Sequence, residues 1–197
     1  MHTIAEPAVF TASAADEQML IAPLLLAFAS DPAVRWMYPN AHQYRTFFPT
    51  FIRAFAGKAF AAGTAHYVED FRGAALWLPP GEEPDESVLG PLLSETVAPS
   101  RQAEVFAVFE QMGAHHPSTP HWYLPLLGVE PRHQRAGYGV ALLRRMLAVC
   151  DHSECSAYLE ATSPDVVGFY ERHGFVATGE IQAGNSPVIV PMVRDAR

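Results

Sequence analysis

The chain has few cysteines, and it contains no apolar run long enough to cross a membrane. Cys150 and Cys155 are too few for a disulfide framework, and their spacing does not match a C-x-x-C redox motif. The longest apolar stretch, Met19 to Ala29, is well short of the ~20 residues that a spanning helix needs. It follows acidic residues, whereas a signal peptide has a basic segment there. We therefore expect a cytoplasmic protein without a membrane partner.

Basic charge is also scarce. The chain carries 13 Lys plus Arg against 21 Asp plus Glu, which gives a formal charge of −8 with neutral histidines. Nucleic-acid binding depends on cationic side chains that displace counterions, so this balance argues against a nucleic-acid partner. It also argues against attachment to anionic lipid.

The apolar content is sufficient for one folded core. Hydrophobic residues make up 49% of the 197 residues and charged residues 17%, which excludes a disordered acidic tail. At roughly 150 residues per domain, this length indicates a single domain over residues 1–197.

The two halves of the chain differ in their predicted elements. In the first half, the patterns predict a strand hairpin over 65–68 and 74–78 and helices over about 16–29, 42–55, 85–93 and 100–112. From residue 122 onward, strands are predicted over 122–129, 157–161, 175–177 and 188–193, with helices over 140–150 and 164–173. This order predicts an α/β arrangement around one sheet, with the helical first half packed against it.

The most informative segment is the turn between a predicted buried strand and the helix that follows it. The first N–H groups of a helix lack intrahelical acceptors, and the helix dipole adds partial positive charge there. Gly137 and Gly139 carry no side chain that would block an anion. From Pro131 to Cys150 the chain has no Asp or Glu but four arginines: Arg132, Arg135, Arg144 and Arg145. The turn therefore suits a phosphate or a pyrophosphate.

Two common nucleotide-binding motifs are absent from this turn. No G-K-[ST] follows, as a Walker loop requires, and the G-x-G-x-x-G spacing of a dinucleotide fingerprint is missing. Both absences disfavour an NTPase and a dehydrogenase.

Two motifs resemble a known superfamily. Gln134 to Gly139 reads Q-R-A-G-Y-G after the strand LLGVEP, and resembles the Q-x-x-G-x-G pyrophosphate loop of the GNAT superfamily of acyl-CoA-dependent N-acyltransferases. Leu159 to Phe175 (LEATSPDVVGFYERHGF) resembles the second signature of that superfamily, in the right order and separation. The resemblance implies a mixed, mostly antiparallel central sheet flanked by helices, with a cofactor-binding core at about 120–193. It also implies acetyl-CoA as co-substrate and direct transfer of the acetyl group to an amine.

Three weaker likenesses extend over most of the chain. Asp31 to Trp36, Ala75 to Gly81 and His115 to Val129 are similar to the puromycin N-acetyltransferase-like branch of the superfamily. This branch implies a primary amine of a small molecule as acceptor, without identifying it or showing that an antibiotic is modified. A protein N-terminus or lysine as acceptor, and a non-catalytic acyl-CoA-binding module, stay open as alternatives. Superfamily members often pair, so a homodimer is one expected oligomeric state.

The resemblance assigns the cofactor contacts residue by residue. Backbone groups of Leu127, Gly128 and Val129 would bind the pantetheine arm like an added strand. The turn would hold the pyrophosphate through Gln134, Arg135, Ala136, Gly137, Tyr138, Gly139 and Val140. Two residues depart from the pattern: many members have Gly in place of Arg135, and Ser163 stands where an Asn often contacts the cofactor. A hydroxyl at Ser163 could replace that contact.

The resemblance also places Tyr170 near the sulfur, where it would protonate the departing thiolate. A phenol with its usual pKa of about 10 carries the required proton at neutral pH. The alternative role for Tyr170 is that of a core aromatic. The general base is open between Glu160, on a strand that faces the expected cleft, and His121.

Two sets of residues superficially resemble metal ligands, and the acceptor site has its own candidates. Neither ligand set has a regular zinc spacing, so we expect no metal: His115, His116 and His121, and Cys150, His152 and Cys155. The acceptor would be shaped by the loop 79–91 and by aromatic residues, any of which could instead belong to the core: Trp36, Tyr38, Phe47, Phe48 and Trp77.

Overall fold

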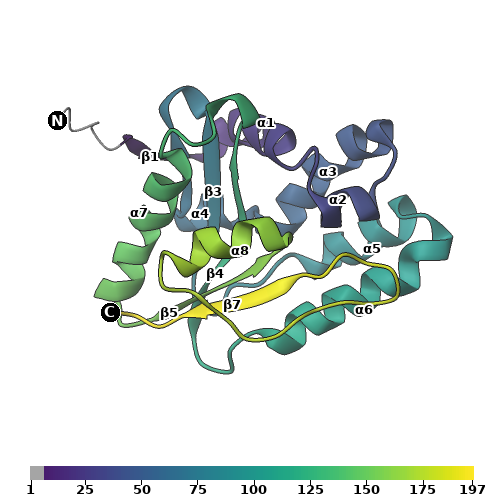
Figure 1. Cartoon of the computed structure of the whole chain (residues 1–197). Helices are drawn as coiled ribbons and strands as arrows, with labels where there is room; N and C mark the ends of the chain where they lie inside the picture. Colours follow the sequence, from purple (N-terminus) through teal and green to yellow (C-terminus); the bar gives the residue numbers. More distant parts are fainter. Residues whose placement is uncertain (1–6) are drawn as a thin grey trace.

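A seven-stranded sheet runs through the computed structural model, which describes residues 7–197 (Figure 1). The strand order is β1-β2-β3-β4-β5-β7-β6, and every neighbouring pair is antiparallel except β4 and β5. The strands are β1 (Val9–Thr11), β2 (Ala65–Val68), β3 (Gly73–Leu78), β4 (His121–Val129), β5 (Ser156–Ala161), β6 (Val176–Ala177) and β7 (Val190–Arg194). The expected mixed, mostly antiparallel sheet is confirmed.

Helices cover both faces of this sheet. They are α1 (Glu17–Ala27), α2 (Pro32–Met37), α3 (Ala41–Ala56), α4 (Lys58–Ala62), α5 (Glu86–Thr96), α6 (Pro99–His115), α7 (Tyr138–His152) and α8 (Pro164–Glu171), with 3-10 turns η1 (Ala14–Asp16), η2 (Glu69–Phe71) and η3 (Pro131–His133). Successive side chains of a strand point to opposite faces. On β5, Tyr158 joins the core cluster of α1, α3, α5 and α6, whereas Ala157 and Leu159 join that of α7 and α8. The first half of the chain therefore covers one face, and α7 and α8 cover the other (Figure 1).

The sheet opens between β4 and β5. Their parallel pairing covers three residue pairs, from His121 with Ser156 to Tyr123 with Tyr158. Beyond Tyr123, β4 continues to Val129 with β3 on its other side, after an irregularity in the β3–β4 register. In the part of the chain that the structure describes, this stretch of β4 has no strand partner on its β5 side. The unpaired edge lies next to the turn that leads into α7.

Three short elements were not predicted from the sequence. Strand β1 has three residues, α4 has five and α2 has six, which is too few to show a hydrophobic period. Helix α2 does carry a local signal, because the carboxylate of Asp31 accepts the N–H of Val34 at 2.9 Å and Pro32 occupies the first helical position.

Candidate active site

The turn before α7 has the conformation that an anion site requires. Gly137 has φ +86 and Arg135 has φ +64, both in the left-handed region. Glycine adopts this conformation without steric cost, so Arg135 occupies a position that glycine would take more readily. Gly137 is the N-cap of α7, and the first N–H groups of the helix have no acceptor within it. These donors and the helix dipole point at the same place.

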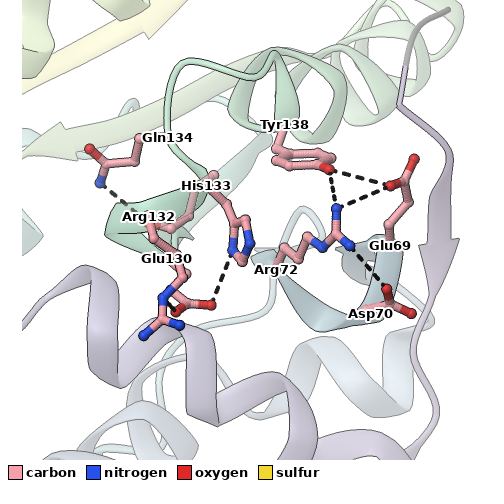
Figure 2. Close-up of polar contacts among 9 residues, drawn as sticks. Glu69, Asp70, Arg72, Glu130, Arg132, His133, Gln134 and Tyr138 are labelled. Carbon is pink, nitrogen blue, oxygen red and sulfur yellow. Dashed lines mark hydrogen bonds and ion pairs between the residues drawn. The ribbon is translucent and has the colours of Figure 1, made fainter.

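Side chains at both ends of the turn tie it to neighbouring elements, as Figure 2 shows. The hydroxyl of Tyr138 accepts a hydrogen bond from Nη1 of Arg72 at 2.8 Å and donates to Oε2 of Glu69 at 3.3 Å. At the other end, Nε2 of Gln134 donates to the carbonyl oxygen of Val129 at 3.2 Å. Tyr138 and Gln134 thus use their side chains as anchors, which leaves the backbone of the turn to face a ligand.

The cationic patch is smaller than the sequence suggests. Nε of Arg132 lies 2.5 Å from Oε1 of Glu130, and Nδ1 of His133 lies 3.1 Å from Oε2 of the same carboxylate (Figure 2). Glu130 immediately precedes the acid-free stretch and neutralises Arg132. Within residues 7–197, the exposed Arg135 forms no ion pair, so its guanidinium is the one available beside the turn.

The register of β4 decides which backbone groups face the open side. The N–H of Glu130 donates to the carbonyl of Arg72 at 2.9 Å. Since hydrogen-bonded pairs alternate along an antiparallel ladder, the backbone groups of Gly128 point toward β3 and those of Leu127 and Val129 point toward the opening. Of the three residues expected to bind pantetheine, Leu127 and Val129 have the orientation for it, and Gly128 does not.

Gly128 has a packing role that explains why it is glycine. A Cβ at this position would lie 2.7 Å from Cβ of Ala27 and 3.1 Å from a methyl group of Leu24. Both residues belong to α1, so Gly128 lets this helix lie directly on β4.

The turn, β4 and α8 meet at Gly139. A Cβ on Gly139 would be 3.7 Å from the ring of Phe169, 3.8 Å from Val129 and 3.9 Å from Leu127. Phe169 precedes Tyr170 on α8, and their rings contact edge to face with centroids 5.0 Å apart. The structure therefore brings the two sequence motifs together at the unpaired edge of β4.

Tyr170 is a buried aromatic whose hydroxyl stays protonated. Its ring also packs on Phe175, with centroids 5.8 Å apart. Burial raises the pKa of Tyr170, and the charge of Asp31 raises it further. Ser163, at the start of α8, accepts the N–H of Asp165 at 3.2 Å as the N-cap of that helix. Its hydroxyl oxygen is thus already engaged in the protein.

Asp31 was not identified from the sequence as a site residue. Burial raises the pKa of its carboxyl group, which accepts hydrogen bonds from the hydroxyl of Thr162 and the N–H of Val34. The contact with Thr162 joins the end of β5 to the start of α2. An aspartate directly before a proline, which is typical of a helix N-cap, was the only sequence signal for it.

On the face of the sheet that the first half of the chain covers, a cavity of about 70 Å³ lies beside the opening between β4 and β5. Pro125, Leu126, Glu160 and Thr162 form its strand side. Helices α2, α3 and α6 supply apolar walls: Ala33, Val34, Trp36, Met37, Phe48, Phe51, Phe55, Val105, Val108, Phe109 and Met112. Nε1 of Trp36 donates to Oδ1 of Asn185 at 2.8 Å, so α2 is joined to the segment before β7 at the rim.

The aromatic residues expected at the acceptor site divide between cavity and core. Trp36 and Phe48 line the cavity. Tyr38 is fully buried with its hydroxyl 2.8 Å from Oγ1 of Thr96, and Phe47 packs against the same core. Trp77 is fully buried in the cluster beneath α7, on the other face of the sheet, so of its two expected roles the structure supports the one in the core.

The two candidate bases lie in different cavities. The Glu160 side chain is 3% exposed and lines the small cavity, and its Oε1 has no hydrogen-bond partner among residues 7–197. His121 lines a separate groove of about 720 Å³, bounded by the 81–86 loop, α5, α6 and the 116–121 loop. His116 lies between Glu160 and His121. His115 points elsewhere, with Nδ1 2.8 Å from the carbonyl oxygen of Gln111.

The described residues include no group of three or more His, Cys, Asp or Glu side chains that could hold a metal ion. Cys150 and Cys155 are free thiols, and Cys150 is buried.

A split central sheet with a phosphate-type turn at the opening defines a class of acyl-CoA-dependent transferases. Residues 97–196 match the acetyltransferase (GNAT) domain family, and the chain belongs to this family. Its members are acyltransferases that generally use acetyl-CoA.

Individual relatives agree with this family. An uncharacterized N-acetyltransferase of Schizosaccharomyces pombe is 24% identical over 206 residues, covering 91% of this chain and 78% of that protein. A Corynebacterium glutamicum structure described as histone acetyltransferase HPA2 and related acetyltransferase has a TM-score of 0.69 at 25% identity, with 98% of each chain covered. Arylalkylamine N-acetyltransferase 2 from Aedes aegypti has a TM-score of 0.68 at 13% identity, covering 98% of this chain and all of that one.

Proposed function

We propose that this protein transfers the acetyl group of acetyl-CoA to the primary amine of a small molecule with an apolar body. The observation that carries this proposal is the small apolar cavity with the buried carboxylate of Glu160, beside the unpaired edge of β4. At about 70 Å³ the cavity is smaller than a typical ligand pocket, so it takes only part of an amine, which it holds by apolar contact and orients through Glu160.

Backbone groups of the turn and of β4 bind the cofactor and stabilise the charge that develops during direct acyl transfer. The N–H groups of the turn and of the first residues of α7 hold the pyrophosphate, with Arg135 beside them. The backbone of Leu127 and Val129 binds the pantetheine arm along the open edge of β4. The N–H of Leu127 is then a donor to the thioester carbonyl, which stabilises the developing oxyanion.

Two side chains act as the general acid and the general base. Tyr170 donates its proton to the departing thiolate, since its raised pKa keeps it protonated. Glu160 takes the proton that the amine loses as the new N–C bond forms. Of the two candidate bases, Glu160 is favoured because it lines the small cavity and His121 does not.

The alternatives fit less well. A protein N-terminus or a lysine would need an open groove at Glu160 to admit its flanking chain, whereas the open groove of about 720 Å³ is separated from Glu160 by Phe55, Phe109 and Met112. A non-catalytic binding module would have no use for a buried carboxylate at the opening. The segments Asp31 to Trp36 and His115 to Val129 support the puromycin N-acetyltransferase-like branch, and both contribute to the cavity or its surroundings.

The two cysteines support a cytoplasmic location. Both thiols are free, which suits the reducing cytoplasm where we place the enzyme. Within residues 7–197, no helix is both long enough and apolar enough to cross a bilayer.

The test is a screen for CoA release with matched amines. Each pair would contain an amine with an aryl or alkyl body and a polar amine of similar size, with N-terminal and lysine peptides as a third set. We expect the apolar amines to be the best substrates. Peptides as the preferred substrates would contradict the small-molecule acceptor. Acetyl-CoA binding in calorimetry without transfer to any amine would favour the non-catalytic module.

A further inference from the structure

Three side chains form a continuous line from the small cavity to the large groove. Nε2 of His116 lies 3.5 Å from Oε1 of Glu160, and Nδ1 of His116 lies 3.0 Å from Nε2 of His121. Glu160 lines the small cavity, and His116 and His121 line the groove. Phe55, Phe109 and Met112 line both spaces and so separate them elsewhere. The line of three side chains crosses this wall.

The hydrogen bonds of this line fix where its protons are. Nδ1 of His121 lies 2.8 Å from the carbonyl oxygen of Thr119, which can only accept, so Nδ1 carries the proton in neutral His121. Its Nε2 is then an acceptor, and Nδ1 of His116 must donate to it. Nε2 of neutral His116 is consequently unprotonated and faces the carboxylate of Glu160.

With neutral His116 and ionised Glu160, no proton lies between Nε2 of His116 and Oε1 of Glu160. Two acceptors face each other there, and Oε1 of Glu160 is buried with no hydrogen-bond partner among the described residues. A proton that arrives at either atom completes an unbroken chain of hydrogen bonds.

From this arrangement we propose that His116 and His121 form a proton relay that carries the amine proton from Glu160 to water in the groove. The N–H bond of the attacking amine breaks as an O–H bond forms on Glu160. That proton moves to Nε2 of His116, while the Nδ1 proton of His116 moves to Nε2 of His121. The resulting His121 imidazolium gives up its Nδ1 proton to water in the groove, which restores the charge of the carboxylate and leaves both rings protonated on Nε2. Return of the proton of each neutral ring to Nδ1 resets the line for the next turnover.

The surroundings suit this role. Burial lowers the pKa of His121, and the neighbouring His116 lowers it further, while the Thr119 carbonyl and Glu160 act in the opposite direction. His121 is thus neutral and ready to accept at neutral pH. The rings of Tyr123 and Tyr158 pack on His116, with centroids 4.7 and 4.4 Å away.

The other charged groups near the line are carboxylates of the groove. They come from the 81–86 loop, α5 and α6, namely Glu82, Glu83, Glu86 and Glu110. Glu82 is paired with Lys58 at 3.4 Å, and the negative charge of the other three stabilises a proton that leaves toward the groove. Burial raises the pKa of Tyr123 and Tyr158, and the charge of Glu160 raises it further. Both phenols therefore stay neutral while a proton passes along the line.

The relay rests on the proposed acetyl transfer, and its test separates the two. His116→Ala and His121→Ala would be compared with His115→Ala, which alters the neighbouring histidine on α6 that points to Gln111. We expect the first two variants to lower kcat at least tenfold and to leave acetyl-CoA affinity unchanged. Free imidazole should restore part of the lost activity, because it can enter the vacated site and carry the proton. His115→Ala should keep wild-type kcat and show no response to imidazole.

A purely structural role for these histidines would not produce imidazole rescue. If either alanine variant fails to fold, His116→Asn and His121→Asn provide the comparison, with the solvent deuterium isotope effect on kcat as the readout. We expect that effect to rise as proton removal becomes rate-limiting. Wild-type kcat and an unchanged isotope effect in both histidine variants, with an inactive Glu160→Gln, would overturn the relay alone. A fully active Glu160→Gln would overturn the base assignment and the relay with it, and a wild-type protein that acetylates no amine would overturn the proposed function.

Discussion

Gly128 on β4 lies directly against Ala27 on α1, so close that a Cβ on Gly128 would come 2.7 Å from Cβ of Ala27. This contact sets the distance between α1 and the strand that borders the opening of the sheet. The missing side chain therefore serves the packing of the first half of the chain on the second half.

Gly128→Ala should destabilise the fold because α1 must move away from β4. We expect a loss of about 1–3 kcal/mol, the usual cost of overpacking, measured by urea unfolding. Gly139→Ala is the control, since its Cβ would meet Phe169 at an ordinary contact distance of 3.7 Å. Its unfolding free energy should change by less than about 0.5 kcal/mol. Equal stability of Gly128→Ala and the wild type would refute the packing role.

Arg135→Gln should weaken acetyl-CoA binding about tenfold at low salt, because a charge-assisted hydrogen bond to phosphate is lost. The comparison is Arg132→Gln, whose guanidinium is already paired with Glu130. Calorimetric titration at low and high salt would measure both, and the difference should shrink as salt screens the charge. An equal effect of both substitutions would show that Arg135 has no special place beside the phosphates.

Tyr170→Phe should lower kcat about a hundredfold, since the leaving thiolate loses its proton donor. Acetyl-CoA affinity should not change, because the ring keeps its contacts with Phe169 and Phe175. Because the pKa of Tyr170 is raised, its phenol stays protonated up to about pH 10. Wild-type kcat should therefore not fall through ionisation of Tyr170 in this range. Tyr67→Phe, on β2, is the control. A Tyr170→Phe variant with wild-type turnover would remove Tyr170 from the acid role.

The buried His66 should make the fold less stable in acid. Burial lowers its pKa from the usual 6.5 to about 4, and Arg145 adds to the effect. Between these two values the unfolded chain binds a proton that the folded protein does not, so stability is present above pH 6.5 and is lost as pH falls toward 4. We expect this residue to contribute a loss of about 2–3 kcal/mol between about pH 7 and pH 4.5.

Unfolding of His66→Gln in urea at several pH values would measure this contribution. The neutral amide should flatten the slope, and His42→Gln, at an exposed position on α3, should keep the wild-type slope. Parallel slopes for His66→Gln and the wild type would exclude His66 as the origin of the acid sensitivity.

Much of the second half of the fold could be predicted from local patterns. The apolar run at 122–129, the glycine turn and the amphipathic helix after it each express their structure within a few residues, and the structure has β4 and α7 there. The left-handed Gly137 and Gly174 likewise stand where a turn and a helix end require them. Strand β1 and helices α2 and α4 each contain less than two periods of their own pattern and could not be found in this way.

Contacts between distant segments could not be predicted. The sequence placed Trp77 among the acceptor candidates, but strand alternation turns it toward α7 once the sheet forms. It offered His121 and Glu160 as rival bases, 39 positions apart. The short parallel pairing of β4 and β5 brings both against His116, which makes them two ends of one line.

The sequence by itself determined the class of protein, because the phosphate turn and the segment around Tyr170 are continuous in the chain. Only the tertiary structure decided which backbone groups of β4 face the opening and which aromatic residues surround the small cavity beside it. The physical reason is that helix caps and turns depend on neighbours in the chain, whereas strand register and side-chain contacts depend on which segments the folded core brings together.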